Sequence, residues 1–396
     1  MTLQTELIKI KDLGNVITGA TPPTKQRNYY GDKAPLIKPT DMVLGQRFIG
    51  DTEESLSDAG IDKFKNKLVP AFTPCVVTIG TIGKSCLTKE KSLVNQAVNC
   101  VVVDTDKFDI MYVYYLLQLT IPTVKSLNSG TASGRENVSK SVFENIDITI
   151  VSNKQSQTVL GKYLSNYDTL IENNTRRIAI LEDMAQSLYR EWFVNFRYPN
   201  HEDNVDADGK PKLIDSPLGQ IPEGWGVKRL DDYVELQRGF DLPKGKRNEE
   251  GGVPIYAASG LTGYHDEIKV RGPGIVTGRS GTLGIVKLVL EDHWPLNTSL
   301  WVKQFKNCTA HYAYYLLDSI GLERFNSGAS VPTLNRNDVH GNPVIAPPNE
   351  LIEKFEEIAS VLHKQINVLQ RKNENLKQQR DMLLPKLISG QIILKD

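Results

Sequence analysis

The sequence predicts an α+β protein in which two mixed α/β domains, related by a pseudo-twofold axis, are separated by two long helices that form an antiparallel coiled coil. Two observations predict this architecture: an internal duplication and two long runs of heptads. Three short segments return about 200 residues later: Tyr112-Val-Tyr-Tyr-Leu-Leu117 as Tyr312-Ala-Tyr-Tyr-Leu-Leu317, Gly80-Thr-Ile-Gly83 as Gly281-Thr-Leu-Gly284, and Leu127-Asn-Ser-Gly130 as Phe325-Asn-Ser-Gly328. Solenoid repeats run only about 20–50 residues. We therefore expect a fused pseudo-dimer with two similar surfaces.

The first heptad run follows the first copy. Its apolar positions alternate spacings of four and three residues, through Leu160, Leu164, Tyr167, Ile171, Ile178, Leu181, Ala185, Leu188 and Trp192. The second run closes the chain, with leucines seven residues apart at Leu362, Leu369, Leu376 and Leu383. Apolar residues at this spacing predict long helices with a coiled-coil seam, over 155–196 and 349–396. About 38 helical residues make a rod of about 57 Å.

Two such helices in one chain most simply pack on each other. They correspond at an offset of 198 residues, which matches Met184 with Met382 and Leu164 with Leu362. The seam has a polar residue at Asn174, and the second seam is polar near Asn373. We expect an antiparallel pairing whose axis passes near Asn174, with the polar seam setting the register. The alternative is a tolerated polar residue without a pairing role.

The remaining segments give the domain boundaries. Residues 1–154 and 223–348 each combine short β-type runs, broken by Gly, Pro and Asp, with one helix, near 109–120 and near 310–320. Residues 197–222 are acidic and then rich in turn residues, which predicts a linker.

Composition excludes several classes of protein. The 396 residues carry a formal net charge of zero, which argues against a protein that coats nucleic acid without sequence preference. No signal peptide and no apolar run near about 18 residues is found, so we expect a cytoplasmic protein without a membrane span. The four cysteines have no metal-like or paired spacing, which favours buried reduced thiols.

No catalytic constellation is found. Thr78-Ile-Gly-Thr-Ile-Gly-Lys84-Ser85 resembles a phosphate-binding loop, but Thr78 stands where that motif needs glycine. The second copy has Gly284-Ile285-Val286 in place of Gly83-Lys84-Ser85, so the shared feature is a glycine-rich turn. The histidines have no spacing suited to a metal, and no metal site is expected.

Both copies instead carry polar, glycine-rich loops in which basic and aromatic residues alternate. In the first copy these loops are 19–30, 38–41 and 128–135, and in the second they are 244–247, 256–264, 277–280 and 326–336. Arg, Lys, Asn, Ser and Thr are the side chains that contact base edges and phosphates. Each loop alone is more often a plain turn, but their recurrence in both copies favours a binding surface.

Taken together, several short segments resemble the specificity (S) subunit of type I restriction-modification systems over the whole chain. They are Ala34-Pro-Leu-Ile-Lys-Pro-Thr-Asp41, Ser216-Pro-Leu-Gly-Gln-Ile-Pro-Glu-Gly-Trp225, Asn326-Ser-Gly328 and Leu384-Pro-Lys-Leu-Ile-Ser-Gly390, in the order domain, helix, domain, helix. The resemblance implies two target-recognition domains, each reading one half of a bipartite double-stranded DNA target. It also implies that the helices act as spacers and dock methyltransferase (M) subunits, expected to be two. Those subunits bind S-adenosylmethionine, and restriction and motor (R) subunits join for cleavage.

On this basis the chain is expected to be noncatalytic and to hold no cofactor of its own. The predicted DNA contacts are Arg27, Lys38, Arg135, Lys244, Arg247, Tyr264, Arg279 and Arg336. The predicted docking residues, for which core packing is the competing interpretation, are Trp192, Phe193, Leu384 and Ile388. The alternative function is a coiled-coil structural adaptor that binds protein partners without recognising DNA.

Overall fold

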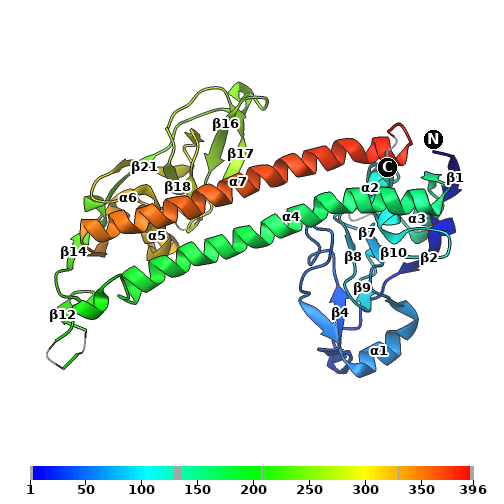
Figure 1. Cartoon of the computed structure of the whole chain (residues 1–396), viewed down its shortest axis with the longest axis horizontal. Coiled ribbons are helices and arrows are strands. Elements are labelled where there is room, and N and C mark those ends of the chain that lie inside the picture. Colours follow the sequence, from blue (N-terminus) through cyan, green and yellow to red (C-terminus); the bar gives the residue numbers. More distant parts are fainter. Residues whose placement is uncertain (1–2, 129–135, 207, 210, 329, 393–396) are drawn as a thin grey trace. The chain divides into compact units, whose positions relative to one another are not determined.

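The computed structural model describes residues 3–128, 136–206, 208–209, 211–328 and 330–392. The chain divides into two compact units (Figure 1). Unit 1 contains Met1–Asn173 and Lys372–Asp396, and unit 2 contains Asn174–Arg371. The two boundaries lie in the two long helices and are 198 residues apart, which is the offset of the repeat in the sequence.

The two long helices are α4, Lys154–Tyr189, and α7, Asn349–Ile388. A π-helical turn, Arg190–Val194, follows α4. The heptad positions Leu160, Leu164 and Ile171 are buried in unit 1, as the spacing of apolar residues requires. The prediction of two long helices is confirmed.

Within each unit the two helices pack in opposite directions. In unit 1, Asp168 contacts Arg380 and the carbonyl of Ile171 accepts a hydrogen bond from the side chain of Asn373 at 3.4 Å. As the residue number rises along α4, from 168 to 171, the number of the contacting residue on α7 falls, from 380 to 373, so the helices are antiparallel. In unit 2, the rings of Tyr189 and Phe355 lie 6.0 Å apart, and those of Trp192 and Phe355 lie 6.2 Å apart. The antiparallel pairing is confirmed, and a register role for Asn174 stays a prediction.

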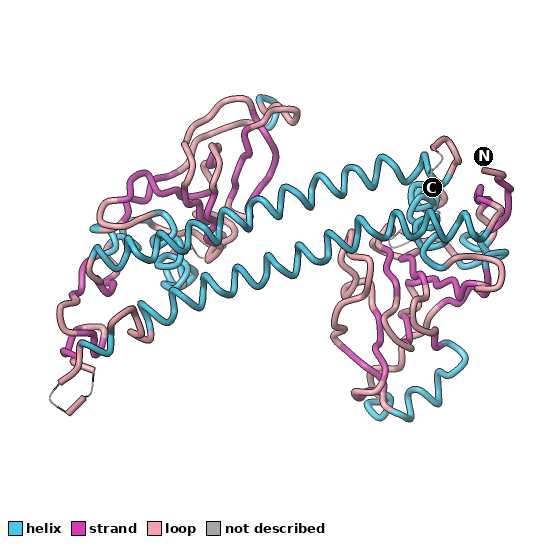
Figure 2. Tube along the Cα trace, in the orientation of Figure 1, coloured by secondary structure: helices cyan, strands magenta, loops and turns pink. Residues whose placement is uncertain are grey.

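The strands of the described part of unit 1 form three sheets, and Figure 2 marks strands and helices by colour. β1 (Thr5–Lys9) pairs with β11 (Asp147–Val151), and a second sheet has the order β2 (Gly14–Thr18), β10 (Val98–Val103), β7 (Pro74–Val77), β8 (Ser85–Leu87). The third has the order β3 (Tyr30–Gly31), β5 (Glu54–Leu56), β4 (Ala34–Ile37), β9 (Ser92–Val94), β6 (Leu68–Val69). The helices of this part are α1 (Asp58–Phe64), α2 (Ile110–Ser126) and α3 (Lys140–Glu144).

Unit 2 repeats this topology. β14 (Gly226–Arg229) pairs with β22 (Pro343–Ala346), and a second sheet has the order β15 (Val234–Arg238), β21 (Ser299–Phe305), β18 (Gly274–Gly278), β19 (Val286–Val289). The third is shorter, with the order β17 (Gly260–His265), β16 (Val253–Ala257), β20 (Trp294–Pro295), and the helices are α5 (Ala310–Ile320) and α6 (Arg336–His340). β4 with β9 and β16 with β20 are the equivalent parallel pairs. The duplication seen in the sequence is therefore a duplication of fold.

The repeated aromatic segment lies in equivalent helices, α2 and α5. Tyr112 and Tyr115 are buried in the core of unit 1, and Tyr312 and Tyr315 are buried in the core of unit 2. Burying these large rings stabilises each unit separately. The segment recurs because each copy needs its own core.

The predicted linker, residues 197–222, contains more structure than expected. It holds the hairpin of β12 (Leu213–Ser216) and β13 (Gly219–Pro222). Ile221 and Trp225 at its end are buried in the core of unit 2, where the centre of the Trp225 ring lies 5.4 Å from that of Tyr198. The turn residues that predicted a linker therefore lie partly in a hairpin at the entry to unit 2.

All histidines of the chain lie in unit 2, which gives the two units different responses to acid. The six are His201, His265, His293, His311, His340 and His363. Burial, with a contribution from the nearby His311, lowers the pKa of His363 to about 4. The ring accepts or donates a 2.8 Å hydrogen bond with the hydroxyl of Tyr315 and lies near Glu356 and Tyr314. Burial also lowers the pKa of His293 and of His340.

We therefore expect unit 2 to lose stability as the pH falls. Below about pH 6.5 the unfolded chain binds protons that folded His363 does not, so the loss accumulates between about pH 6.5 and the folded pKa of about 4. At about pH 5 the His363 contribution is on the order of 1–2 kcal/mol. Urea unfolding followed by tryptophan fluorescence measures it, because all four tryptophans lie in unit 2.

The matched control is His363→Gln, which should show a weaker dependence of the urea midpoint on pH than the native chain. Equal midpoints for the native chain at about pH 7.5 and about pH 5 would contradict the prediction.

Candidate nucleic-acid interface

The asparagine of the repeated Asn-Ser-Gly segment makes an equivalent hydrogen bond to the backbone in both units. The side-chain oxygen of Asn128 accepts a hydrogen bond from the backbone N–H of Asn137 at 2.8 Å. The equivalent Asn326 accepts one from the backbone N–H of Thr333 at 2.9 Å. Asparagine favours such local bonds to the backbone. The repeated asparagine of this segment is thus explained by the same kind of local hydrogen bond in both units.

The other repeated segment, Gly-Thr-x-Gly, lies beside the residues to which these asparagines bond. The N–H of Gly80 donates to the carbonyl of Glu136 at 2.9 Å, and the N–H of Gly281 donates to the carbonyl of Pro332 at 2.9 Å. Gly80 and Gly281 have φ values of 85° and 92°, a left-handed conformation that favours glycine. In each unit, the first glycine of this segment therefore bonds to the backbone of a described residue at an equivalent place, Glu136 in unit 1 and Pro332 in unit 2.

In unit 1 the structure brings Arg27 and Lys38 together around one carboxylate. A guanidinium nitrogen of Arg27 lies 3.7 Å from Glu54 and the ammonium of Lys38 lies 2.8 Å from it. The guanidinium carbon of Arg27 is also 5.4 Å from the centre of the Tyr30 ring. Arg27 is 73% exposed, so its side chain is available to an anionic ligand.

Lys38 is less available. It is 22% exposed and forms a second ion pair with Glu53 at 3.1 Å. Its hydrogen bond to Glu54 is the largest cause that raises the pKa of this ammonium. Its contact with DNA stays a prediction that would require exchange of these carboxylates for phosphate. Arg135 lies outside the described residues.

In unit 2, Lys244, Arg247 and Tyr264 come from two neighbouring segments. Lys244 begins a short 3-10 turn and is exposed, and Tyr264 on β17 is 40% exposed. Arg247 is partly buried, and its outer nitrogen donates to the carbonyl of Leu242 at 3.5 Å. Lys244 and Tyr264 are therefore exposed, and Arg247 is held against its own loop.

Arg279 and Arg336 lie on two segments of unit 2 that hydrogen-bond to each other through their backbones. The N–H of Leu334 donates to the carbonyl of Arg279 at 2.9 Å, so the segment that leads into Arg336 runs beside Arg279. Arg336 begins α6 and lines an open hollow of about 610 Å³ together with Arg238 and Lys303. The structure thus brings the two predicted arginines onto adjoining segments.

The sequence reasoning missed one aromatic and basic cluster in unit 2. The ammonium of Lys269 lies 4.7 Å from the centre of the Trp294 ring and 6.0 Å from that of Phe240. Such cation–π contacts hold a cation over an aromatic face. The three residues are far apart in the sequence, and Lys269 adjoins the acidic Asp266 and Glu267, so no local pattern marked it.

The four predicted docking residues are buried in cores. Trp192 and Phe193 belong to the core of unit 2, while Leu384 and Ile388 belong to the core of unit 1. Their burial follows the competing interpretation of core packing. A docking role for them stays a prediction, and it could act only through the surfaces that they support.

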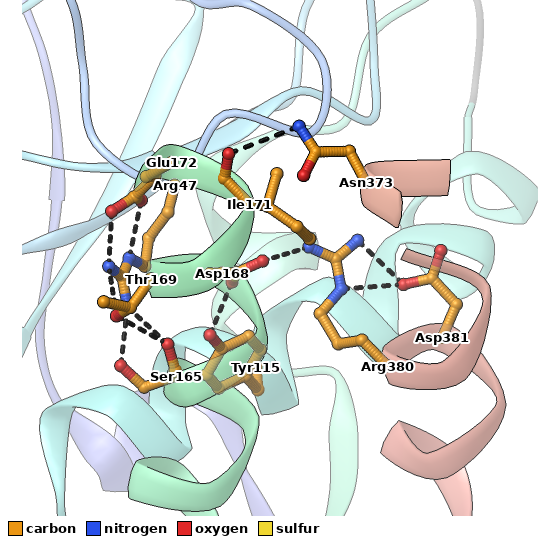
Figure 3. A network of polar contacts seen from close by, with 10 residues as sticks. All are labelled: Arg47, Tyr115, Ser165, Asp168, Thr169, Ile171, Glu172, Asn373, Arg380 and Asp381. Carbon is orange, nitrogen blue, oxygen red and sulfur yellow. Dashed lines mark hydrogen bonds and ion pairs between the residues drawn. The ribbon is translucent and has the colours of Figure 1, made fainter. Parts of the chain in front are cut away.

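Unit 1 also contains a buried polar network that the sequence did not mark (Figure 3). Asp168 on α4 forms an ion pair with Arg380 on α7 and accepts a hydrogen bond from the hydroxyl of Tyr115 on α2. On the other side of α4, Arg47 pairs with Glu172 at 2.7 Å. These contacts join the strand-rich part of unit 1 to the helices.

Two other kinds of site are absent from the described residues. In the part of the chain that the structure describes, no group of three His, Cys, Asp or Glu side chains is placed to hold a metal ion. No helix within the same residues has the length and apolar character needed to cross a membrane.

Comparison with known proteins gives a consistent result. The model of the type I restriction modification DNA specificity domain matches residues 4–183 and 222–379. The chain is 25% identical to the type I restriction enzyme MjaIX specificity subunit of Methanocaldococcus jannaschii, over 98% of this chain and 93% of that protein. It is 30% identical to the HindI specificity subunit of Haemophilus influenzae over 45% of this chain and 39% of that protein.

Among solved structures, the type I restriction-modification system S subunit from M. genitalium aligns with a TM-score of 0.64 and 19% identity. The alignment covers 99% of this chain and 97% of that one, so the fold is shared over the whole length. Because the family model covers both copies of the repeat, the chain belongs to the family of type I restriction modification DNA specificity domains.

Proposed function

We propose that the chain is the noncatalytic DNA-specificity subunit of a type I restriction-modification complex, and that each unit reads one half of a bipartite target. The observation that carries this proposal is the repeat itself. The two units share topology and the asparagine bonds to the backbone, but their exposed loops differ in sequence and length. Two similar frames with different contact residues suit a ligand with two different half-sites.

The exposed loop residues support binding to DNA. Arg27 and Lys244 are exposed cations, and Ser280 and Ser327 on the glycine-rich loops of unit 2 add small polar side chains. Such groups hold phosphates and contact base edges. A net charge of zero fits a reader with local basic segments better than a protein that coats DNA.

We further propose that methyltransferase subunits, expected to be two, dock on the helices. Exposed apolar residues recur on them at the 198-residue offset: Leu170 with Val368, and Met184 with Met382. Each unit exposes one member of each pair, which would give two similar docking surfaces. On this proposal the partners bind S-adenosylmethionine and supply the chemistry, and restriction and motor subunits join through the complex.

The test is selection of bound sequences from a randomised DNA duplex pool by the full chain together with its methyltransferase partner. We expect enrichment of two short motifs separated by a constant gap. Arg27→Ala with Lys244→Ala should weaken binding, while Lys107→Ala, an exposed lysine paired with Asp104, serves as the control.

Specific binding is commonly on the order of 10³-fold or more tighter than nonspecific binding, which selection resolves easily. No enrichment at any salt concentration would favour the alternative, a coiled-coil adaptor for protein partners. Enrichment of one uninterrupted motif would contradict the assignment of one half-site to each unit.

A further inference from the structure

In unit 1 a short segment adds to the edge of the central sheet. The N–H of Leu87 on β8 donates to the carbonyl of Arg47 at 2.7 Å, and the N–H of Ile49 donates to the carbonyl of Leu87 at 3.0 Å. Phe48 forms a parallel bridge to Leu87 between these two bonds. Residues 47–49 therefore lie beside the edge strand β8 and extend the sheet by one short segment.

The side chain of Arg47 fixes this segment to α4. It is 6% exposed, and it donates to the carbonyl of Ser165 at 3.2 Å, to Thr169 at 3.2 Å and to both oxygens of Glu172 at 3.0 and 2.7 Å. A further bond to the hydroxyl of Ser165 engages the last of its five N–H donors. Figure 3 shows the guanidinium group held along one side of the helix.

The described residues of unit 2 include no counterpart of this segment. In unit 1, β4 and β5 are joined by residues 38–53, which include Arg47, whereas in unit 2 the equivalent β16 and β17 are joined by residues 258–259 alone. Among the described residues, β19 is consequently an edge of its sheet. Leu288 on β19 is the counterpart of Leu87, since Ile275 faces Leu288 as Pro74 faces Leu87. By the same register, its backbone groups face away from β18.

Beside this edge lies a cavity of about 430 Å³ within unit 2. One wall is β19 and the residues after it, and α5 contributes Tyr315 and Asp318. α7 contributes His363, Asn367 and Gln370, which stand at the offset of 198 residues from Ser165, Thr169 and Glu172. The cavity therefore occupies the position that Arg47 fills in unit 1.

The charged side chains that line the cavity are mainly acidic, which favours a cationic ligand. It is lined by three carboxylates, Glu182, Glu291 and Asp318, and by one lysine, Lys287. In the described part of the chain, Glu182 and Asp318 have no ion-pair partner, while Glu291 pairs with Arg371 at 3.1 Å.

The position in unit 1 that is equivalent to Glu182 carries the opposite charge. Glu182 stands where unit 1 has Arg380, so the charge at this position is reversed. Partial desolvation, followed by the nearby Glu323, raises the pKa of Asp318, although the side chain is still exposed on one side.

We propose that this cavity and the edge of β19 bind an extended segment of a partner protein that adds to the sheet and places an arginine among Glu182, Asp318 and His363. The chain itself shows this mode of binding in unit 1, where residues 47–49 do the same within one chain. Addition of a strand to an open edge is a common way to bind a peptide. Arginine suits the site because its planar fork pairs with carboxylates and stacks on tyrosine rings.

A nucleic acid is the less suitable occupant. Its phosphates would face three carboxylates, and like charges at close range oppose binding. The proposal does not rest on the proposed reading of DNA, because it is argued from the cavity and the open edge in unit 2 and from the equivalent contacts of Arg47 in unit 1.

The probe is a blocked peptide with the sequence of residues 44–50, Leu-Gly-Gln-Arg-Phe-Ile-Gly, added to the full chain and measured by titration calorimetry and by hydrogen exchange. We expect binding in the millimolar range or tighter, with protection of residues 286–291. The same peptide with alanine in place of arginine should bind at least about tenfold more weakly, because it lacks the charge-assisted bonds.

The variant Glu182→Gln with Asp318→Asn should show the same loss of about tenfold, whereas Glu202→Gln with Asp203→Asn, exposed acids elsewhere in unit 2, should bind as the native chain does. The comparison of the two peptides on the native chain keeps the test valid if a variant fails to fold. Equal binding of both peptides, no binding at millimolar concentration, or protection outside 286–291 would overturn the proposal. Protection of these residues by a short DNA duplex instead would overturn it as well.

Discussion

Replacing Arg380 by methionine is expected to destabilise unit 1 by about 3–5 kcal/mol, because it leaves a buried carboxylate without its cation. Asp168 is 4% exposed, and its remaining described partner is the hydroxyl of Tyr115. A neutral hydroxyl does not replace a guanidinium as the counter-charge. Calorimetric unfolding of the full chain, combined with hydrogen exchange of residues 154–173, measures the loss.

A double variant separates the loss of the pair from the burial of an unpaired charge. Arg380→Met with Asp168→Leu removes both charges, and we expect it to recover most of the stability that Arg380→Met loses. The exposed pair of Lys140 and Glu144, at 3.6 Å, gives the control within unit 1. Lys140→Met should cost less than about 1 kcal/mol. A double variant as unstable as Arg380→Met alone would show that packing, and not charge, determines the loss.

The architecture was predictable because its signals are local or repeated. Heptads determine a helix within a few turns, and the two copies of Tyr-x-Tyr-Tyr-Leu-Leu mark equivalent core helices. The antiparallel pairing followed from having two such helices in one chain. The hairpin 213–222 was missed because its glycines and prolines are equally typical of a loop.

The contacts of single side chains were less predictable. Lys38 is of a residue type that commonly contacts DNA, but it forms ion pairs with Glu53 and Glu54 at the start of β5. Arg47 has no local signal, because its partners on α4 are more than a hundred residues away. Trp192 and Leu384 lie near helix ends, where an apolar residue has the same sequence pattern whether it is exposed or buried; both are buried. The surroundings of these side chains depend on residues far away in the sequence, and no short window of sequence contains that information.

The comparison of the units also indicates which parts of the repeat can diverge. Arg47, Asp168 and Arg380 form a buried network in unit 1, whereas the equivalent positions of unit 2 hold a cavity, Ile366 and Glu182. The core positions of α2 and α5, in contrast, hold the same residues in both units, as Tyr112 with Tyr312 and Leu117 with Leu317 show. Packing of the frame is thus retained, and the polar contacts between the frame and its helices are specific to each copy.

The second large effect is expected from the length of the helices. α4 and α7 each run without a break across the boundary between the units, so a matched insertion in both should move one unit relative to the other. We consider three heptads, about 21 residues, placed after Asn174 and after Lys372, because whole heptads preserve the seam. They add about 31 Å at 1.5 Å per residue.

Such an insertion corresponds to about nine base pairs at about 3.4 Å each, close to one turn of DNA. We therefore expect both half-sites to be retained and the gap between them to lengthen by about nine base pairs. Binding to the native target should fall to the nonspecific level, on the order of 10³-fold or more. Selection from a randomised pool measures the half-sites and the gap together.

A single heptad in both helices is the matched control. It adds about 10 Å, or about three base pairs, and would turn the second half-site by roughly a quarter of a turn around the DNA axis. We expect this variant to fold but to bind neither the native target nor a target with the longer gap. If instead the half-sites change while the gap stays constant, the helices do not set the spacing, and the loops alone determine which sequence is read.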